Sequence, residues 1–119
     1  MPKYLVLIYG NEQRWDAASA EEMKQIDEGH RTFHVRAGDA ILAAGELERT
    51  TTASSLRAAT ADGSPAVTDG PFPETKEALG GFYVVDVADV EEAISLAGCL
   101  AEISHDHSGV EVRPLVGRG

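Results

Sequence analysis

The sequence has little of several residue types, and each shortage excludes a class of protein. It contains a single cysteine, Cys99, which excludes an internal disulfide bond and a cysteine-based metal cluster. Lysine and arginine number 10 against 20 acidic residues, which gives a formal net charge of −10. A chain so poor in cations is unsuited to bind nucleic acid or an anionic membrane surface. No apolar run approaches the roughly 20 residues that a membrane-spanning helix requires.

The composition that remains is that of one globular domain. The chain has 119 residues, of which 43% are hydrophobic and 25% charged. The apolar run Leu5–Ile8 near the N-terminus is too short for the core of a signal peptide. No glycine-rich phosphate loop or dinucleotide motif is present, so we expect no cofactor. The sequence therefore predicts a single cytoplasmic domain over residues 1–119.

Hydrophobic spacing and capping patterns predict strands and two helices. The segments 3–9 and 82–87 are apolar at alternate positions on both faces, which is typical of strands in the middle of a covered sheet. Ser19 and Asp89 each begin a capping box, so helices should follow them, the first running to about Ala37. Shorter strands are expected at 40–47, 52–57, 65–68 and 110–112, with a hairpin turn at 61–64.

This order of elements predicts an α+β fold with the split β-α-β arrangement of a ferredoxin-like sandwich. In that topology the two segments that are apolar on both faces become the central strands. Two helices cover only one face of such a sheet, and the other apolar face needs its own cover. A second copy of the sheet is the simplest cover, so we expect a homodimer.

The segment 67–83 is the most distinctive part of the sequence. Two prolines stiffen it, and Asp69 can bond backbone amides in an Asx turn. Phe72 is apolar within a loop and should enter a pocket or contact a partner, and Lys76 lies between two glutamates. Ordered loops of this length often bind ligands. A stiff structural connection in which Asp69 only forms the turn is the alternative.

This segment closely resembles the signature of the DGPF family, within the wider YCII-related superfamily. The resemblance extends to the opening strand 3–10, the strand end Ala44–Leu47, the block Asp69–Tyr83 and the closing Val110–Leu115. It implies a ferredoxin-like monomer that pairs as a dimeric α+β barrel. Related proteins carry a histidine–aspartate pair suspected of catalysis, and His30 and Asp69 match those two residues.

His30 is the strongest candidate for chemistry. It lies on the apolar stripe of the first predicted helix, and an imidazole beside a carboxylate is suited to act as a general base. With Asp69 it would catalyse a proton transfer of the lyase, isomerase or hydrolase type. Lys76 or Arg113 would then bind an anionic ligand, and Phe72 and Tyr83 would form pocket walls. A core histidine bonded to a backbone carbonyl is the alternative.

Two histidine clusters have spacings that could suit a metal, but the sequence favours none. Asp27, His30 and His34 can lie on one side of a helix, yet no further ligand can be named. His105-Asp106-His107 is explained by a solvated turn.

For function, we expect a small-molecule-binding dimer. The alternative is a non-catalytic regulatory or accessory protein, linked to an extracytoplasmic-function sigma factor as the genes of family members often are.

Overall fold

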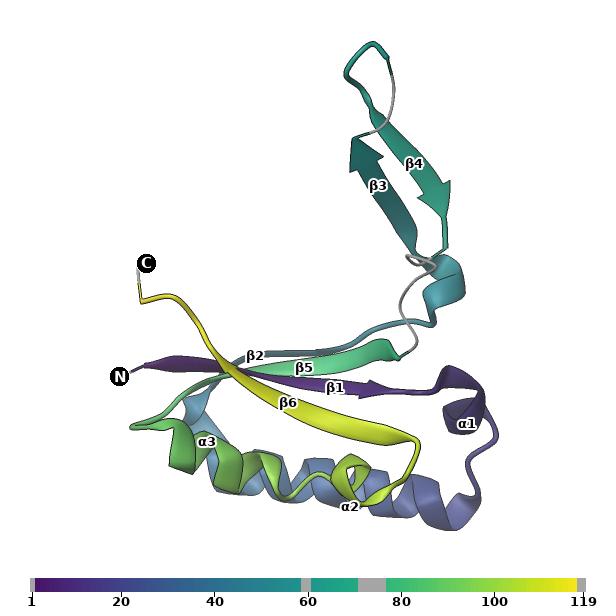
Figure 1. Ribbon diagram of the computed structural model, residues 1–119. Helices are drawn as coiled ribbons and strands as arrows, with labels where there is room; N and C mark the ends of the chain where they lie inside the picture. The colour runs from purple at the N-terminus through teal and green to yellow at the C-terminus, as the bar shows by residue number, and fades with distance from the viewer. Residues whose placement is uncertain (1, 59–60, 71–76, 118–119) are drawn as a thin grey trace.

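A four-stranded antiparallel sheet forms the centre of the molecule (Figure 1). The computed structural model describes residues 2–58, 61–70 and 77–117. The strands lie in the order β2-β5-β1-β6, with bounds β1 Lys3–Gly10, β2 Ile41–Glu46, β5 Ala78–Asp86 and β6 Ser108–Pro114. The two segments that are apolar on both faces are indeed the two central strands, β1 and β5. The predicted ferredoxin-like α+β fold is therefore confirmed.

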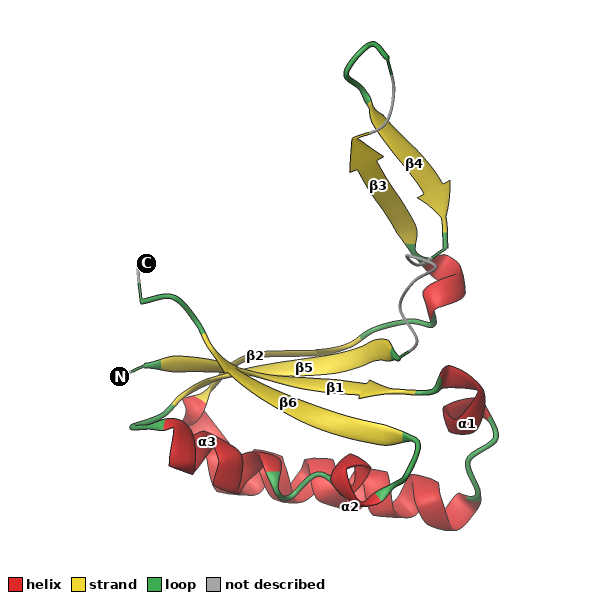
Figure 2. Cartoon of the chain, viewed as in Figure 1, coloured by secondary structure: helices red, strands yellow, loops and turns green. Residues whose placement is uncertain are grey.

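The two main helices, α2 (Ala20–Ala37) and α3 (Val90–Ala97), cover the same face of this sheet (Figure 2). Both begin at the predicted caps: the Ser19 hydroxyl accepts a bond from the amide of Glu22 at 3.1 Å, and the Asp89 carboxylate accepts one from Glu92 at 2.9 Å. A short helix, α1 (Glu12–Asp16), is not predicted, because five residues are too few to show a period. Among the described residues, no helix is long and apolar enough to cross a membrane.

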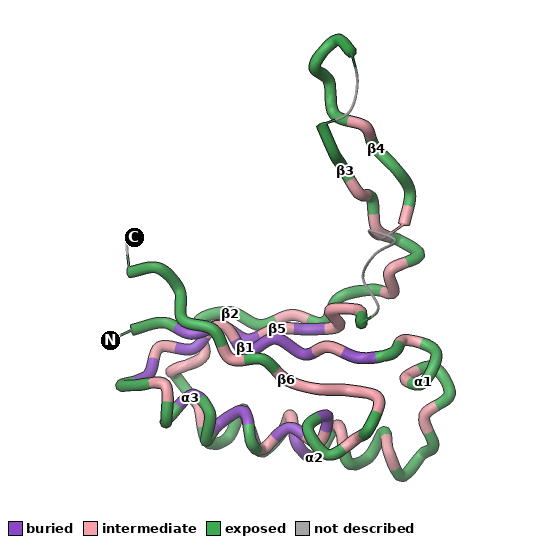
Figure 3. The backbone as a smooth tube through the Cα atoms, in the orientation of Figure 1, coloured by how far each residue is buried: buried purple, intermediate pink, exposed green. Residues whose placement is uncertain are grey.

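The hydrophobic core lies between the helices and the sheet, where most of the buried backbone in Figure 3 is found. Alternate residues of β1 and β5 point toward the helices, as the period of two in a strand requires. Phe33 of α2 is fully buried against them. The buried cluster consists of Tyr4, Val6, Ile8, Phe33, Tyr83, Val85, Val87, Ala93, Leu96, Ala97 and Leu100.

On the opposite face of the sheet the described residues form no helix, and the central strands are apolar there. Leu5 pairs with Val84 and Leu7 with Phe82 across the two central strands, so these side chains share the helix-free face. Arg113 of β6 is exposed and pairs with Leu5, which places it on this face as well.

A separate two-stranded hairpin, β3 (Ser54–Ala58) and β4 (Pro65–Asp69), projects away from the main sheet (Figure 1). It forms as the sequence predicts, with the turn at 61–64. Its cross-strand pair Leu56 and Val67 is 54% and 61% exposed, so one face of the hairpin presents apolar side chains to solvent.

The start of β5 differs from the prediction. The strand begins at Ala78, whereas the sequence predicts a start at Phe82, because two consecutive glycines, Gly80 and Gly81, are typical of a turn. The indole of Trp15 packs over Gly80, where an added Cβ would lie 2.7 Å from the ring. The glycine therefore makes room for Trp15 within a strand and does not end one.

Candidate functional site

A cavity of about 500 Å³ lies between α2, the β2–β5 edge of the sheet and Trp15 of α1. Apolar side chains and the backbone of the strand glycines form much of its wall. Its ionisable lining residues are Asp27, His30, His34, Glu46, Arg49, Tyr83 and Glu102. A mostly apolar cavity with a few convergent polar groups is typical of a small-molecule site.

Helix α2 supplies three of these polar residues from one side. Asp27, His30 and His34 are spaced at i, i+3 and i+7, which places them on one helix face, and all three line the cavity. The shared orientation that the sequence predicted for them is therefore what the structure has.

A close approach of two backbones brings a fourth residue to this face. Gly29 is buried in α2, and a Cβ there would lie 2.7 Å from the carbonyl oxygen of Cys99 and 3.0 Å from the amide nitrogen of Ala101. Only glycine permits the helix and the 99–101 backbone to pack so tightly. The short 3-10 helix η3 (Ala101–Ser104) follows directly and carries Glu102 toward His30.

Glu102, His30 and Tyr83 form a hydrogen-bonded chain that we call the cavity triad. His30 Nε2 lies 2.8 Å from Glu102 Oε2, and His30 Nδ1 lies 2.5 Å from the Tyr83 hydroxyl. An ionised carboxylate only accepts hydrogen bonds, so Nε2–H donates to Glu102. The lone pair of a neutral ring is then on Nδ1, where it accepts the hydroxyl proton of Tyr83. Both ring nitrogens of His30 are thus partnered within the chain.

The surroundings of Tyr83 hold it in its neutral form. Its ring stacks on Phe33 with centroids 4.0 Å apart, and His34 meets its ring edge-on. Burial raises the pKa of the Tyr83 hydroxyl to about 12, and the negative charge of Glu102 adds to the rise. The phenol therefore keeps its proton at neutral pH and donates a hydrogen bond to His30 Nδ1.

Glu102 is buried, with its side chain 6% exposed, while the side chain of His30 is 26% exposed. Its second carboxylate oxygen, Oε1, is buried and has no hydrogen-bond partner among the described residues. This buried carboxylate therefore has one acceptor atom that no hydrogen bond of the described residues satisfies.

The far wall of the cavity carries a cation held in place by α1. Arg49 bonds through Nε to Asp16 at 2.8 Å, and its guanidinium lies 5.5 Å from the centre of the Trp15 ring. Glu12 accepts a bond from the amide of Thr50 at 2.8 Å and another from its hydroxyl. Helix α1 thereby fixes the segment that follows β2 against the cavity.

Comparison with known protein families identifies the chain. The model of the YCII-related domain matches residues 2–116, which is nearly the whole sequence. The chain belongs to the YCII-related family. It is 39% identical over 116 residues to the uncharacterized protein R00369 of Rhizobium meliloti (strain 1021), a match that covers 94% of this chain and 90% of that relative.

The sequence-predicted site residues of this YCII-related chain fall in different places. His30 and Tyr83 come together in the cavity triad. Asp69 ends β4 on the projecting hairpin, and Arg113 lies on the helix-free face; neither is among the residues that line the cavity. Phe72 and Lys76 lie outside the described residues.

Among the cavity-lining residues that the sequence prediction missed are Glu102, Trp15 and Arg49. For Glu102 a signal existed, because it is a single acid inside the otherwise apolar run from Cys99 to Ile103. A lone acid at such a place is either exposed by the turn of the backbone or buried with a partner. For Trp15 and Arg49 no local pattern indicates a shared site.

Proposed function

We propose that this YCII-related protein binds a small molecule in the cavity and catalyses proton transfer through the cavity triad. The observation that carries the proposal is the chain of hydrogen bonds from buried Glu102 through His30 to Tyr83, at the wall of a cavity of about 500 Å³. A tyrosine hydroxyl bonded to a carboxylate-oriented histidine is an arrangement suited to general acid–base chemistry.

Each member of the triad has a distinct part in this proposal. Glu102 fixes the tautomer of His30 and stabilises the imidazolium that forms when Nδ1 accepts a proton. Tyr83 transfers its proton to Nδ1 as its own oxygen takes one from the ligand, so the proton reaches His30 over the Tyr83–His30 hydrogen bond, while the Nε2–H of His30 stays bonded to Glu102. The reaction is of the lyase, isomerase or hydrolase type, and Arg49 supplies a cation for an anionic ligand.

We also propose that the protein acts as a homodimer and that Asp69 contributes from the hairpin. The apolar helix-free face and the exposed pair Leu56 and Val67 both support a cover by a second copy. An isolated two-stranded hairpin is marginally stable in water, so packing against a partner would also stabilise β3 and β4. Since both nitrogens of His30 are partnered, Asp69 would act on the ligand.

The catalytic proposal is tested with His30→Asn and a matched control, Val35→Asn, on the exposed side of the same helix and outside the cavity lining. A library of small carboxylic acids and carbonyl compounds is screened by thermal shift on the full chain, and each hit is tested for turnover by NMR. We expect His30→Asn to lower turnover by about 10²–10⁴-fold with the fold intact by circular dichroism. Unchanged turnover in His30→Asn would contradict the proposal.

The dimer is tested by sedimentation of Val84→Asp, which places a charge on the helix-free face, beside Val35→Asp on the exposed side of α2. Monomers with the first variant and dimers with the second are expected. Asp69→Asn should lower turnover without dissociating the dimer. Ligand binding with no turnover in any variant or in the natural sequence would favour the regulatory alternative.

A further inference from the structure

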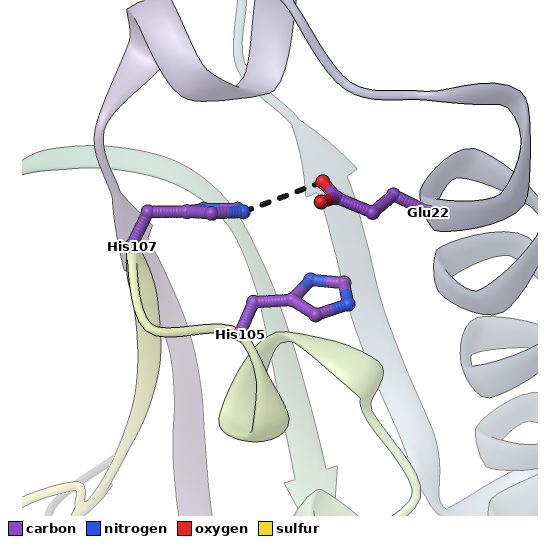
Figure 4. A group of neighbouring side chains, drawn as sticks. All are labelled: Glu22, His105 and His107. Atoms are coloured by element: carbon purple, nitrogen blue, oxygen red, sulfur yellow. Dashed lines mark ion pairs between the residues drawn. The ribbon is translucent and has the colours of Figure 1, made fainter.

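A second group of ionisable side chains lies where the first turns of α2 meet the turn before β6. Glu22, His105 and His107 converge there (Figure 4), and we call them the turn cluster. One ligand atom of each lies within 4.8 Å of the others. None of the three lines the cavity, so this group is separate from the cavity triad.

The backbone around both histidines is fixed by hydrogen bonds. The amide of Ser108 donates to the carbonyl of His105 at 3.1 Å, and the amide of Asn11 donates to the carbonyl of His107 at 3.0 Å. Glu22 occupies the first turn of α2, where its own amide is capped by Ser19. The three side chains are therefore held by ordered backbone, and the turn is not the solvated one that the sequence predicted.

His107 is the most buried member. Its side chain is 3% exposed, and its Nε2 lies 3.4 Å from Glu22 Oε1 without a hydrogen-bond partner among the described residues. The other ring nitrogen, Nδ1, lies 2.7 Å from the Ser108 hydroxyl. That hydroxyl oxygen has two lone pairs, so it can accept from Nδ1–H while it also accepts from Trp15 Nε1–H at 2.8 Å.

His105 is oriented by an amide. Its Nε2 lies 3.2 Å from the side-chain oxygen Oε1 of Gln25, and the side-chain nitrogen Nε2 of Gln25 donates to Glu21 Oε1 at 3.5 Å. An amide oxygen only accepts, so His105 Nε2 carries the proton and the lone pair of the neutral ring is on Nδ1. This Nδ1 is buried and has no partner among the described residues.

Protonation alone does not satisfy this group. An imidazolium at His107 would pair with Glu22, yet the lone pair on His105 Nδ1 would still be buried without a donor. A cation between the three side chains satisfies both lone pairs and the carboxylate together. Nitrogen ligands from imidazole suit zinc and its first-row neighbours and not magnesium or calcium.

We propose that Glu22, His105 and His107 bind a divalent zinc ion. The 3.4 Å between His107 Nε2 and Glu22 Oε1 matches the ligand–ligand edge of about 3.3 to 3.4 Å that tetrahedral zinc with bonds near 2.05 Å requires. Gln25 and Ser108 hold the remaining ring nitrogens, as outer partners of zinc-ligating histidines do. Three protein ligands leave the fourth position for water. The ion links α2 to the turn before β6.

The test is a titration of chelator-treated full-length protein with ZnCl₂ in competition with a chromophoric chelator. We expect one equivalent per chain, and we expect Glu22→Gln and His107→Asn each to weaken binding by at least about 10–100-fold, the loss that even changes outside the ligand shell cause. The matched control is Glu28→Gln, an exposed carboxylate on the same helix, with affinity unchanged.

Cobalt substitution gives a readout of geometry besides affinity. Co²⁺ bound to the natural sequence should show the intense visible bands of a tetrahedral site, and Glu22→Gln should lose them. A double variant, His30→Asn with His34→Asn, should keep them. Absence of stoichiometric zinc binding would overturn the proposal. Loss of zinc binding in the His30/His34 variant with retention in Glu22→Gln would also overturn it.

Discussion

The cavity triad and the turn cluster each combine a glutamate with histidine and each have one member on α2, yet their hydrogen bonding differs. In the triad both nitrogens of His30 have partners, Glu102 and Tyr83. In the turn cluster each imidazole has one partnered nitrogen and one buried nitrogen without a partner among the described residues. A fully partnered imidazole relays protons, whereas converging unpartnered lone pairs favour a metal ion.

The neighbours decide this difference. Tyr83 brings a hydroxyl proton to the second nitrogen of His30, so no lone pair is left over. The side-chain amide oxygen of Gln25 accepts a hydrogen bond from the Nε2–H of His105, so the lone pair of the neutral ring is on Nδ1, which has no partner among the described residues. The difference between His30 and His105 is thus whether a hydrogen-bond donor lies beside the ring nitrogen that carries the lone pair.

The largest expected effect comes from a substitution that changes the packing around the cavity triad and leaves the turn cluster unchanged. Phe33→Ala deletes a fully buried ring that stacks on Tyr83. We expect the free energy of unfolding to fall by about 3–5 kcal/mol, measured by urea denaturation, with zinc affinity of the folded protein kept. Val35→Ala, on the exposed side of the same helix, is the control and should change stability by less than about 0.5 kcal/mol. Equal losses in both variants would contradict this separation.

The second effect belongs to the turn cluster alone. Zinc at a hundredfold excess over its dissociation constant should stabilise the natural sequence by about 2.7 kcal/mol, because the ion binds only the folded state. Thermal unfolding with and without ZnCl₂ measures this. Glu22→Gln should lose the stabilisation, while Tyr83→Phe should keep it. A zinc effect that disappears in Tyr83→Phe would show that the two groups are not independent.

The third effect belongs to the triad and depends on pH. The pKa of Tyr83 is raised from 10.0 to about 12, so the unfolded chain loses this proton first as the pH increases. The contribution of Tyr83 is fully present below pH 10 and is lost between pH 10 and 12, on the order of 2 kcal/mol.

This loss is measured as the pH dependence of unfolding in the natural sequence minus that in Tyr83→Phe. Glu102→Gln should lower the pKa of Tyr83 but leave it above 10, because burial is the larger cause. A Tyr83 that titrates at its ordinary pKa in the natural sequence would contradict the buried, hydrogen-bonded state of the hydroxyl.

The smallest effect concerns Ser108, whose side chain bonds to residues of both regions. Ser108 accepts from Trp15, which lines the cavity, and holds His107 of the turn cluster. Ser108→Ala should cost about 1–2 kcal/mol from two lost hydrogen bonds and weaken zinc binding more than ligand binding. Ser95→Ala, whose exposed hydroxyl accepts a bond from exposed Arg36, should cost less than about 0.5 kcal/mol.

Hydrophobic periodicity and helix-capping patterns predict most of the fold from the sequence. Ser19 and Asp89 begin the two main helices, and the double-sided apolar runs become the central strands, because these patterns are local. The site was predicted only in part. His30 is visible on a helical stripe, but Glu102 reaches it across 72 positions of sequence, and no local pattern encodes such a pairing.

For the hairpin, the local sequence predicts the pairing of its strands but not their position relative to the main sheet. The turn at 61–64 predicts that β3 and β4 pair, but it does not predict that they leave the main sheet, which depends on contacts elsewhere. The pairing of His30 with Asp69 rested on the resemblance and stays a prediction. The sequence predicts a solvated turn for His105 and His107 because their contacts to α2, at Glu22 and Gln25, are made by residues distant in sequence.

Gly29 has a consequence for how this protein tolerates mutation. Both groups bridge the same contact between α2 and the segment from Cys99 onward, and Gly29 allows that contact. Even a methyl group at position 29 would push the two backbones apart and separate Glu102 from His30 and Glu22 from His105. A genetic screen for lost zinc affinity and a screen for lost ligand binding should therefore both recover this position, although it touches neither ligand.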